Sequence, residues 1–330
     1  MLPDDDVKTV QELHHACQSI QTEVAKVLVG QQQVIEDLLT ALLSGGHCLL
    51  VGVPGLAKTL MIRSLAKALD VKFNRIQFTP DLMPADITGT EVIQEDRSMG
   101  QRSYRFLPGP IFANLVLADE INRTPPKTQA ALLEAMQEQG VTVGGETHSL
   151  PAPFFVLATQ NPIEQEGTYP LPEAQLDRFM FNLNIEYPST EDEVSIVRET
   201  TTPEIQSLNA VITKSEIATY QDLVRRVPIA DNVVEYAVKL VGATRPNSST
   251  APDFIQQSVD WGAGPRASQY LVLGAKAKAI LDGRPSPNIN DIQSLAFPIL
   301  RHRVLPNFNA EAEGLKVEDI LTRLLDTIVE

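Results

Sequence analysis

The amino-acid sequence predicts an α/β fold, in which a five-stranded parallel sheet with helices on both faces carries β-hairpin insertions and is followed by a smaller, all-helical domain. Short apolar runs alternate with helical periodicity in the first half of the chain, which is typical of a covered parallel sheet. After Tyr187-Pro188 these runs stop and helical periodicity dominates. A glycine-containing loop follows the first run and opens a helix, the context of a phosphate-binding loop. The predicted strands are residues 47–51, 72–78, 115–118, 154–158 and 179–185.

We expect two domains, residues 1–188 and 189–330, because the strand pattern ends at their junction. Apolar residues recur every three or four positions between residues 7 and 44 and are interrupted by Gly30, which predicts two helices before the first strand. The predicted helices of the second domain are residues 190–199, 214–226, 230–243, 266–281, 288–299 and 316–329.

Two segments of the first domain, residues 89–107 and 141–150, are predicted to be β-hairpin insertions. The second has Gly144-Gly145 between extended flanks. The first could present a basic and aromatic patch to nucleic acid, although we favour a solvated hairpin in so acidic a chain. The side chains of that patch are Arg97, Arg102, Tyr104, Arg105 and Phe106.

The composition is that of a soluble globular protein, with a net charge of -15 that disfavours a broad nucleic-acid interface. Cys17 and Cys48 form neither a disulfide framework nor a metal-ligand pattern, which favours the reducing cytoplasm. We expect no membrane span and no signal peptide, because no apolar run approaches about 20 residues and the first residues are acidic. The five histidines lack metal-ligand spacing, so we interpret them as structural or surface residues; they are His14, His15, His47, His148 and His302.

The loop Gly52-Val53-Pro54-Gly55-Leu56-Ala57-Lys58-Thr59, with Leu60 opening the next helix, is predicted to bind the phosphates of ATP. Backbone N–H groups at a helix N-terminus attract anions, Lys58 would neutralise the β and γ phosphates, and the Thr59 hydroxyl would ligate Mg²⁺. Ala57 stands where the usual pattern has glycine. The alternative is an ordinary turn between strand and helix.

A second motif, Asn114-Leu115-Val116-Leu117-Ala118-Asp119-Glu120, is an apolar strand that ends in two acids. We predict that Asp119 holds the magnesium ion and that Glu120 acts as the general base toward the attacking water. An acidic strand end alone can simply mark where a strand meets solvent, so this prediction depends on its pairing with the phosphate loop.

Together these motifs resemble those of the AAA+ superfamily, and their amino-acid sequences are similar to those of its MoxR family, in the helix-2-insert branch. The resemblance covers nearly the whole chain and accounts for Ala57. The matching segments include Gly-Val-Pro-Gly-Leu-Ala-Lys-Thr at 52–59, Ala-Asp-Glu-Ile-Asn-Arg at 118–123, Leu-Pro-Glu-Ala-Gln-Leu-Asp-Arg-Phe at 171–179 and Gly-Pro-Arg at 264–266.

The resemblance implies four further site elements. Asn161 matches sensor 1, which orients the lytic water, and Arg178 matches the arginine finger, which reaches the nucleotide of the neighbouring subunit. Arg266 matches sensor 2, which contacts the nucleotide of its own subunit, and Val29-Gly30 matches the segment that packs on adenine. The alternatives are a turn-forming asparagine for Asn161, a surface ion pair with Asp177 for Arg178, and a structural role for Arg266.

The resemblance implies an Mg-ATP-hydrolysing ring ATPase, a nucleotide-dependent hexamer that acts as a chaperone or maturation factor for client proteins. For the MoxR family the implied clients are von Willebrand factor type A domain proteins. A nucleic-acid motor of the same branch and a nucleotide-dependent scaffold with little turnover are the alternative functions. A small-molecule P-loop kinase would fit the phosphate loop but would not require the remaining motifs.

Overall fold

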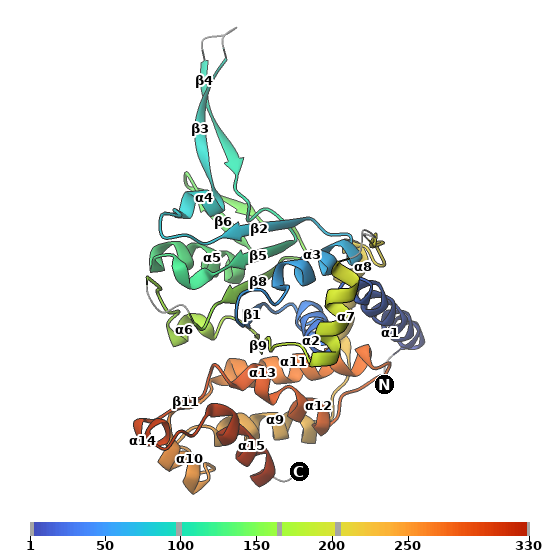
Figure 1. Ribbon diagram of the computed structural model, residues 1–330, viewed down its shortest axis with the longest axis vertical. Coiled ribbons are helices and arrows are strands. Elements are labelled where there is room, and N and C mark those ends of the chain that lie inside the picture. The colour runs from blue at the N-terminus through green and yellow to red at the C-terminus, as the bar shows by residue number, and fades with distance from the viewer. Residues whose placement is uncertain (1–2, 97–100, 164–166, 202–205, 329–330) are drawn as a thin grey trace.

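Five parallel strands form the central sheet, in the order β2-β5-β8-β1-β9. We describe it from a computed structural model, which defines residues 3–96, 101–163, 167–201 and 206–328 (Figure 1). Each of the five predicted apolar runs forms one of these strands, so this part of the fold prediction is confirmed. The strands are β1 (Cys48–Val51), β2 (Phe73–Gln77), β5 (Leu115–Asp119), β8 (Phe155–Gln160) and β9 (Phe181–Asn184).

Alternate residues along the three inner strands, β5, β8 and β1, enter two different apolar cores, because successive side chains of a strand point to opposite faces. Leu50 packs with side chains from the N-terminal helices and the second domain, whereas Leu49 packs with side chains such as Leu132 and Met136 of the opposite layer. The helices and 3₁₀ turn of the first domain are α1 (Asp4–Ala25), α2 (Gln32–Leu43), α3 (Lys58–Ala68), α4 (Pro84–Thr88), η1 (Ile121–Arg123), α5 (Pro126–Glu138) and α6 (Glu173–Leu176).

Both predicted hairpins are present: β3 (Gly89–Asp96) pairs with β4 (Gln101–Pro108), and β6 (Gly140–Val143) pairs with β7 (Glu146–Ser149). The β3–β4 hairpin projects far from the sheet (Figure 1). At its base the backbones of Gly89 and Gly109 are in direct contact, since a Cβ on Gly89 would lie 2.6 Å from the nitrogen of Gly109. Arg97 lies outside the described residues.

The second domain is helical, as predicted, with the addition of a short antiparallel pair of strands, β10 (Val259–Trp261) and β11 (Leu305–Pro306). Its longest helix, α11, packs against α1 and α2 of the first domain as well as against α8, α9, α12 and α13. The helices are α7 (Thr190–Thr200), α8 (Lys214–Arg226), α9 (Asp231–Ala243), α10 (Asp253–Ser258), α11 (Pro265–Leu281), α12 (Ile289–Ser294), α13 (Ala296–Leu300), α14 (Phe308–Ala312) and α15 (Val317–Thr327).

The single helix predicted for residues 288–299 is wrong in one respect, because the structure divides it into α12 and α13 at Leu295. Pro298 explains the division. Proline has no N–H to donate to the carbonyl four residues earlier, and its ring clashes with that carbonyl, here the carbonyl of Ser294.

Across the described residues, no helix combines the length and the apolar character that a membrane crossing requires. Cys17 and Cys48 are both buried free thiols. Burial raises the pKa of the Cys17 thiol to about 12, because the thiolate is poorly solvated in the core.

Candidate nucleotide site

The loop between β1 and α3 has the backbone geometry of an anion cradle. α3 begins at Lys58, and two residues of the preceding loop have positive φ, 89° at Gly55 and 54° at Ala57. No atom of the described residues lies within 4 Å of a Cβ placed on Gly55, so the loop is open where a phosphate would approach. At Gly52 a Cβ would lie 2.8 Å from the carbonyl of Ile185, and glycine is therefore needed for packing.

A cavity of about 330 Å³ opens directly above this loop and collects most of the predicted catalytic residues. Lys58 and Thr59 come from the start of α3, whereas Asp119, Glu120 and Asn161 come from the carboxyl ends of the neighbouring strands β5 and β8. The carboxyl ends of parallel strands meet at one edge of a sheet, which is where ligands bind in α/β folds. The lining residues are Pro54, Gly55, Ala57, Lys58, Thr59, Leu60, Asp119, Glu120, Thr159 and Asn161.

The Thr159 hydroxyl ties the two acidic residues to β8. It donates to Asp119 Oδ1 at 2.6 Å and accepts from the N–H of Glu120 at 2.8 Å. Glu120 has φ 57° and ψ 48°, a left-handed conformation that is rare for a residue with a side chain. The threonine therefore fixes both the direction of Asp119 and the strained turn at Glu120.

Three polar residues that the sequence analysis did not identify contact the acids from the other side. Arg75 donates from Nε to Asp119 Oδ2 at 2.9 Å. Gln77 donates to Glu120 Oε2 at 2.8 Å, and Arg123 donates to the same oxygen at 3.0 Å. Arg75 and Gln77 alternate along β2 and so share one face. That alternation was visible in the sequence, but the pairing of β2 with β5 was not.

Lys58 lies in a partly desolvated position at the floor of the cavity, where its Nζ donates to the carbonyl of Gly52 at 2.5 Å. Burial lowers the pKa of Lys58, while the charges of Asp119 and Glu120 oppose that shift. Asp119 is paired with Arg75 and Glu120 with Arg123, so the positive charge of Lys58, whose Nζ is bound to a neutral carbonyl, is left to attract an anion into the cavity.

A larger cavity of about 810 Å³ joins the first and is mostly apolar. The two share the lining residues Pro54, Gly55, Ala57 and Leu60. Val29, Leu56 and Leu60 line it from the first domain, and Ile196 and Val197 line it from α7. A polar cavity that continues into an apolar one matches the two ends of a nucleotide, a charged phosphate chain and a flat base.

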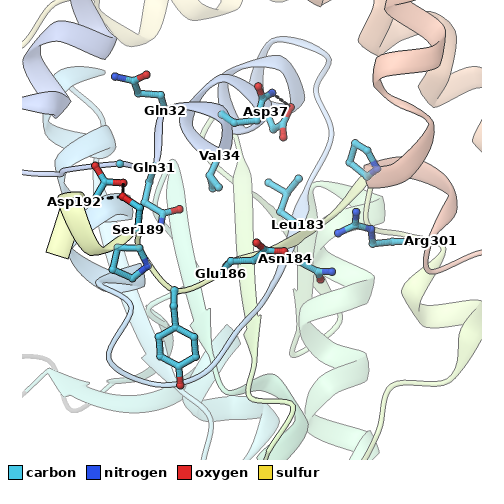
Figure 2. Close-up of a pocket in the computed structure, with 15 residues that line it drawn as sticks. Gln31, Gln32, Val34, Asp37, Leu183, Asn184, Glu186, Ser189, Asp192 and Arg301 are labelled. Carbon is cyan, nitrogen blue, oxygen red and sulfur yellow. Dashed lines mark hydrogen bonds between the residues drawn. The ribbon is translucent and has the colours of Figure 1, made fainter. Parts of the chain in front are cut away.

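Gly30 does not line this larger cavity but lines a neighbouring one of about 330 Å³ with Gln31, Asp192 and Arg301 (Figure 2). Its φ is 82°, and a Cβ there would lie 2.9 Å from Asp192 Oδ2. Glycine is thus required where the chain turns between α1 and α2. Its placement brings Val29, the preceding residue, to the apolar cavity.

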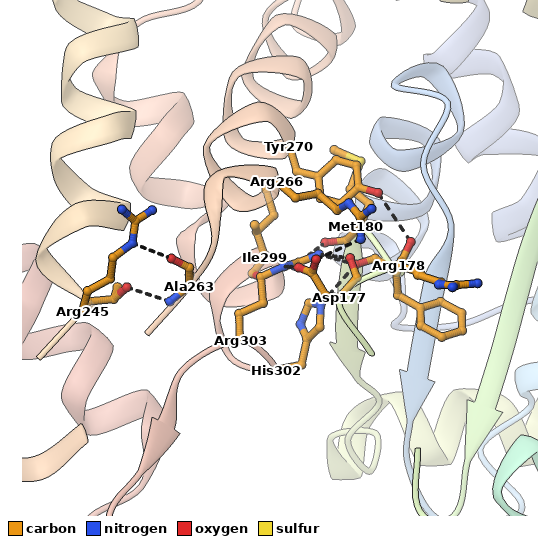
Figure 3. A network of polar contacts seen from close by, with 12 residues as sticks. Asp177, Arg178, Met180, Arg245, Ala263, Arg266, Tyr270, Ile299, His302 and Arg303 are labelled. Carbon is orange, nitrogen blue, oxygen red and sulfur yellow. Dashed lines mark hydrogen bonds and ion pairs between the residues drawn. The ribbon is translucent and has the colours of Figure 1, made fainter. Parts of the chain in front are cut away.

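Arg178 and Arg266 lie together, away from the Lys58 cavity (Figure 3). Arg266 donates to Asp177 Oδ2 at 2.9 Å, and Asp177 also accepts from Arg303 at 2.7 Å. The guanidinium of Arg178 makes no hydrogen bond or ion pair with the described residues, so the alternative of an ion pair with Asp177 is not observed. Arg178 instead lines a separate cavity beside α5.

The donor set around the Lys58 cavity fits a magnesium nucleotide. Thr59 and Asp119 present a hydroxyl and a carboxylate, the oxygen ligands that Mg²⁺ prefers. Within the described ranges, no group of three or more His, Cys, Asp or Glu side chains could hold a metal by itself. A magnesium ion here would therefore be held partly by phosphate and water, which is its usual coordination beside a nucleotide.

Comparison with known proteins agrees with this geometry. The model of the ATPase family associated with various cellular activities (AAA) matches residues 47–181, and that of the AAA lid domain matches residues 254–324. The chain is 42% identical to Chaperone MoxR1 of Mycobacterium tuberculosis, with 93% of this chain and 80% of the relative aligned. It is 29% identical to Protein MoxR of Paracoccus denitrificans, over 93% of this chain and 94% of the relative.

The fold is also that of a solved structure. A crystal structure of a Cytophaga hutchinsonii protein, assigned as a candidate ATPase, superposes with a TM-score of 0.90 at 40% identity and covers 98% of this chain and 97% of its own. The sheet and the helical lid thus have the same overall arrangement in this chain as in that structure. The chain belongs to the MoxR family of AAA+ ATPases.

Proposed function

We propose that the protein hydrolyses Mg-ATP in a ring of identical subunits and uses the energy to act on client proteins. The observation that carries this proposal is the convergence of Lys58, Asp119, Glu120 and Asn161 on one cavity above the phosphate loop. A phosphate-binding loop alone would support only the binding of a nucleotide. A general base and a water-orienting amide at the same cavity support hydrolysis.

Four side chains of the cavity bind or activate the reacting groups in this proposal. Lys58 and the N–H groups at the start of α3 bind the phosphates, and Thr59 and Asp119 hold Mg²⁺, which supplies positive charge to the transferring phosphoryl group. Glu120 takes a proton from the attacking water. Its carboxylate is now bound by Gln77 and Arg123, so it must exchange these partners for water before it can act as a base.

The position of Arg178 supports assembly into a ring. Its guanidinium is unpaired among the described residues and lies apart from the Lys58 cavity of its own chain. A second subunit whose cavity faces this arginine would receive the positive charge that stabilises the transition state, an effect of about 10³-fold or more in related phosphoryl-transfer enzymes. Arg266 was expected to contact the nucleotide of its own subunit, but it pairs with Asp177 and does not line the Lys58 cavity; we propose that it acts beside Arg178 toward the neighbouring subunit.

The β3–β4 hairpin offers a surface for clients. Ile93 and Tyr104 are opposite each other in the hairpin register and are 61% and 74% exposed. An exposed apolar pair on a projecting arm favours contact with protein. One relative, Chaperone MoxR1, is named as a chaperone, which supports a protein client; von Willebrand factor type A domain proteins are the client class that we propose.

The decisive experiment measures phosphate release from Mg-ATP across a series of protein concentrations, with sedimentation velocity on the same samples. Turnover per wild-type subunit should rise with assembly. Glu120→Gln and Arg178→Ala should bind ATP but lose turnover. Turnover that does not depend on concentration would contradict the ring, and binding without turnover would favour a nucleotide-dependent scaffold.

The client class is tested separately, by adding a von Willebrand factor type A domain protein or single-stranded DNA to the assembled wild-type enzyme. We expect the protein to raise ATP turnover and Ile93→Ser/Tyr104→Ser to abolish that increase. Stimulation by DNA that falls steeply with salt would instead favour the nucleic-acid motor.

A further inference from the structure

The segment that carries Arg178, residues 177–180, is held between the two domains in an unusual way. Its N–H groups bind the first domain: Arg178 donates to the carbonyl of Gln175 at 3.2 Å, and Met180 donates to the carbonyl of His47 at 2.8 Å. Its carbonyl groups all point to the second domain. We call residues 177–180 the finger segment.

Each of the four carbonyl groups of the finger segment accepts a hydrogen bond from a lid side chain (Figure 3). Arg303 supplies most of them, donating to the carbonyls of residue 177 at 2.9 Å, residue 179 at 2.6 Å and residue 180 at 3.2 Å. Tyr270 donates its hydroxyl to the carbonyl of Arg178 at 3.4 Å. His302 Nε2 lies 3.1 Å from the carbonyl of residue 179.

Arg303 is almost fully buried, at 5% exposure, and its guanidinium lies 5.2 Å from the centroid of the Tyr270 ring. Taking a guanidinium out of water is costly unless its donors are satisfied. Here the Asp177 carboxylate balances the charge and backbone carbonyls take the remaining donors. All but one of the hydrogen bonds of Arg303 are therefore made to one short segment of the other domain, and the remaining one goes to the carbonyl of Ile299 in the lid.

The side chain of Arg178 is left out of this network. Its backbone is bound on both sides, while its guanidinium makes no bond with the described residues. Restraint of the backbone and freedom of the charged group are what a residue needs if it must reach a ligand outside its own chain.

We propose that Arg303, assisted by Tyr270, is a positioning residue for Arg178 that joins the finger segment rigidly to the lid. The orientation of the lid in one subunit then sets the position of that subunit's finger in the neighbouring nucleotide site. This inference rests on the proposed function. It adds a route by which the nucleotide state of one site, acting through its lid, is passed to the next site.

The test is a subunit-mixing experiment with Arg303→Lys. A lysine keeps the charge but cannot reproduce the planar fork that reaches several carbonyls at once. We expect kcat to fall about 10²-fold, the loss typical of a group misplaced by about 1 Å, with unchanged ATP affinity. Tyr270→Phe keeps the ring beneath Arg303 but removes the hydroxyl that binds the carbonyl of Arg178, and it should lower kcat only a few-fold. It is the variant to test if Arg303→Lys does not fold.

Mixing Arg303→Lys with Glu120→Gln subunits separates a finger defect from a general structural defect. The Glu120→Gln subunit cannot hydrolyse ATP but presents an intact finger, so the mixture should turn over ATP faster than either variant alone. Arg178→Ala mixed with Glu120→Gln gives the reference rescue. Arg284→Lys is the matched control, because Arg284 is another ion-paired arginine of the lid, bound to Asp282 and Asp291, but does not contact the finger segment; it should keep wild-type turnover.

The outcomes distinguish this inference from the proposed function. Rescue of both Arg303→Lys and Arg178→Ala supports the inference. Rescue of Arg178→Ala alone, or wild-type turnover in Arg303→Lys, overturns it and leaves the ring ATPase intact. Absence of assembly-dependent turnover in the wild type overturns the proposed function and this inference with it.

Discussion

The hydroxyl of Thr159 lies between the two acidic residues of the site, donating to Asp119 Oδ1 at 2.6 Å and accepting from the N–H of Glu120 at 2.8 Å. It is almost fully buried, at 1% exposure. Both bonds are therefore made where water cannot easily replace them, and one side chain orients Asp119, the proposed metal ligand, together with Glu120, the proposed base.

Thr159→Val should remove both bonds without changing the shape of the side chain. The unsatisfied N–H of Glu120 costs about 1–3 kcal/mol of stability, and the loosened acids should lower kcat by about 10-fold or more while ATP still binds. Chemical denaturation and phosphate release measure the two effects. Thr159→Ser keeps the hydroxyl and should behave like the wild type; equal loss in both variants would contradict the hydrogen-bonding role.

Lys58→Met should weaken ATP binding. The ammonium of Lys58 lines the phosphate cavity and is expected to bind the phosphates directly. Loss of a charge-assisted hydrogen bond costs about 1.5–3 kcal/mol, which corresponds to a roughly 10- to 100-fold rise in the Kd for ATP. Isothermal titration calorimetry with ATP and with adenosine measures this loss of affinity. Adenosine affinity should not change, and a parallel loss of adenosine binding would show that the variant disturbs the loop itself.

Ala57→Gly should stabilise the protein. Ala57 has φ 54° and ψ 22°, a left-handed conformation that costs about 1–2 kcal/mol for a residue with a Cβ, while glycine loses about 0.5–1 kcal/mol more entropy on folding. The net gain is small, about 0.5–1 kcal/mol. Urea denaturation measures it, and Ala57→Val, which is branched at Cβ, should be clearly destabilising. A loss of stability in Ala57→Gly would show that the left-handed conformation of Ala57 does not destabilise the folded protein.

His47 should make the fold sensitive to mild acid. Its Nδ1 accepts from the N–H of Val156 at 3.1 Å, and burial lowers its pKa to about 4. The unfolded chain protonates near the usual value of 6.5, so the contribution of His47 is complete above that pH and is lost as the pH falls toward 4. Between pH 6.5 and 5 the loss is about 2 kcal/mol.

The stability difference between wild type and His47→Gln, measured by denaturation at several pH values, isolates this effect. Glutamine can donate and accept but does not titrate. The wild type should lose its advantage as the pH falls from 6.5 to 5, and a difference that stays constant over that range would show that His47 does not titrate between the two states.

The features that could be predicted from the sequence are those that depend on residues close together along the chain. The five strands, both hairpins and the convergence of Lys58 with Asp119 follow from short motifs and from the rule that parallel strands end at one edge. Arg75 and Gln77 were missed because their contact with the acids depends on β2 lying next to β5. Arg303 was missed because its partners lie more than 120 residues away and are backbone carbonyls, which carry no signal in side-chain identity.

The glycine pair at the base of the β3–β4 hairpin has a consequence for how the protein can diversify. The arm leaves the body through Gly89 and Gly109, whose backbones touch, so a side chain at either position would force the arm apart from the sheet. Beyond that junction the strands can lengthen, shorten or change sequence while the cavity above the phosphate loop stays the same. The arm can therefore vary as a separate unit, so that the client specificity and the ATP turnover that we propose can change independently in evolution.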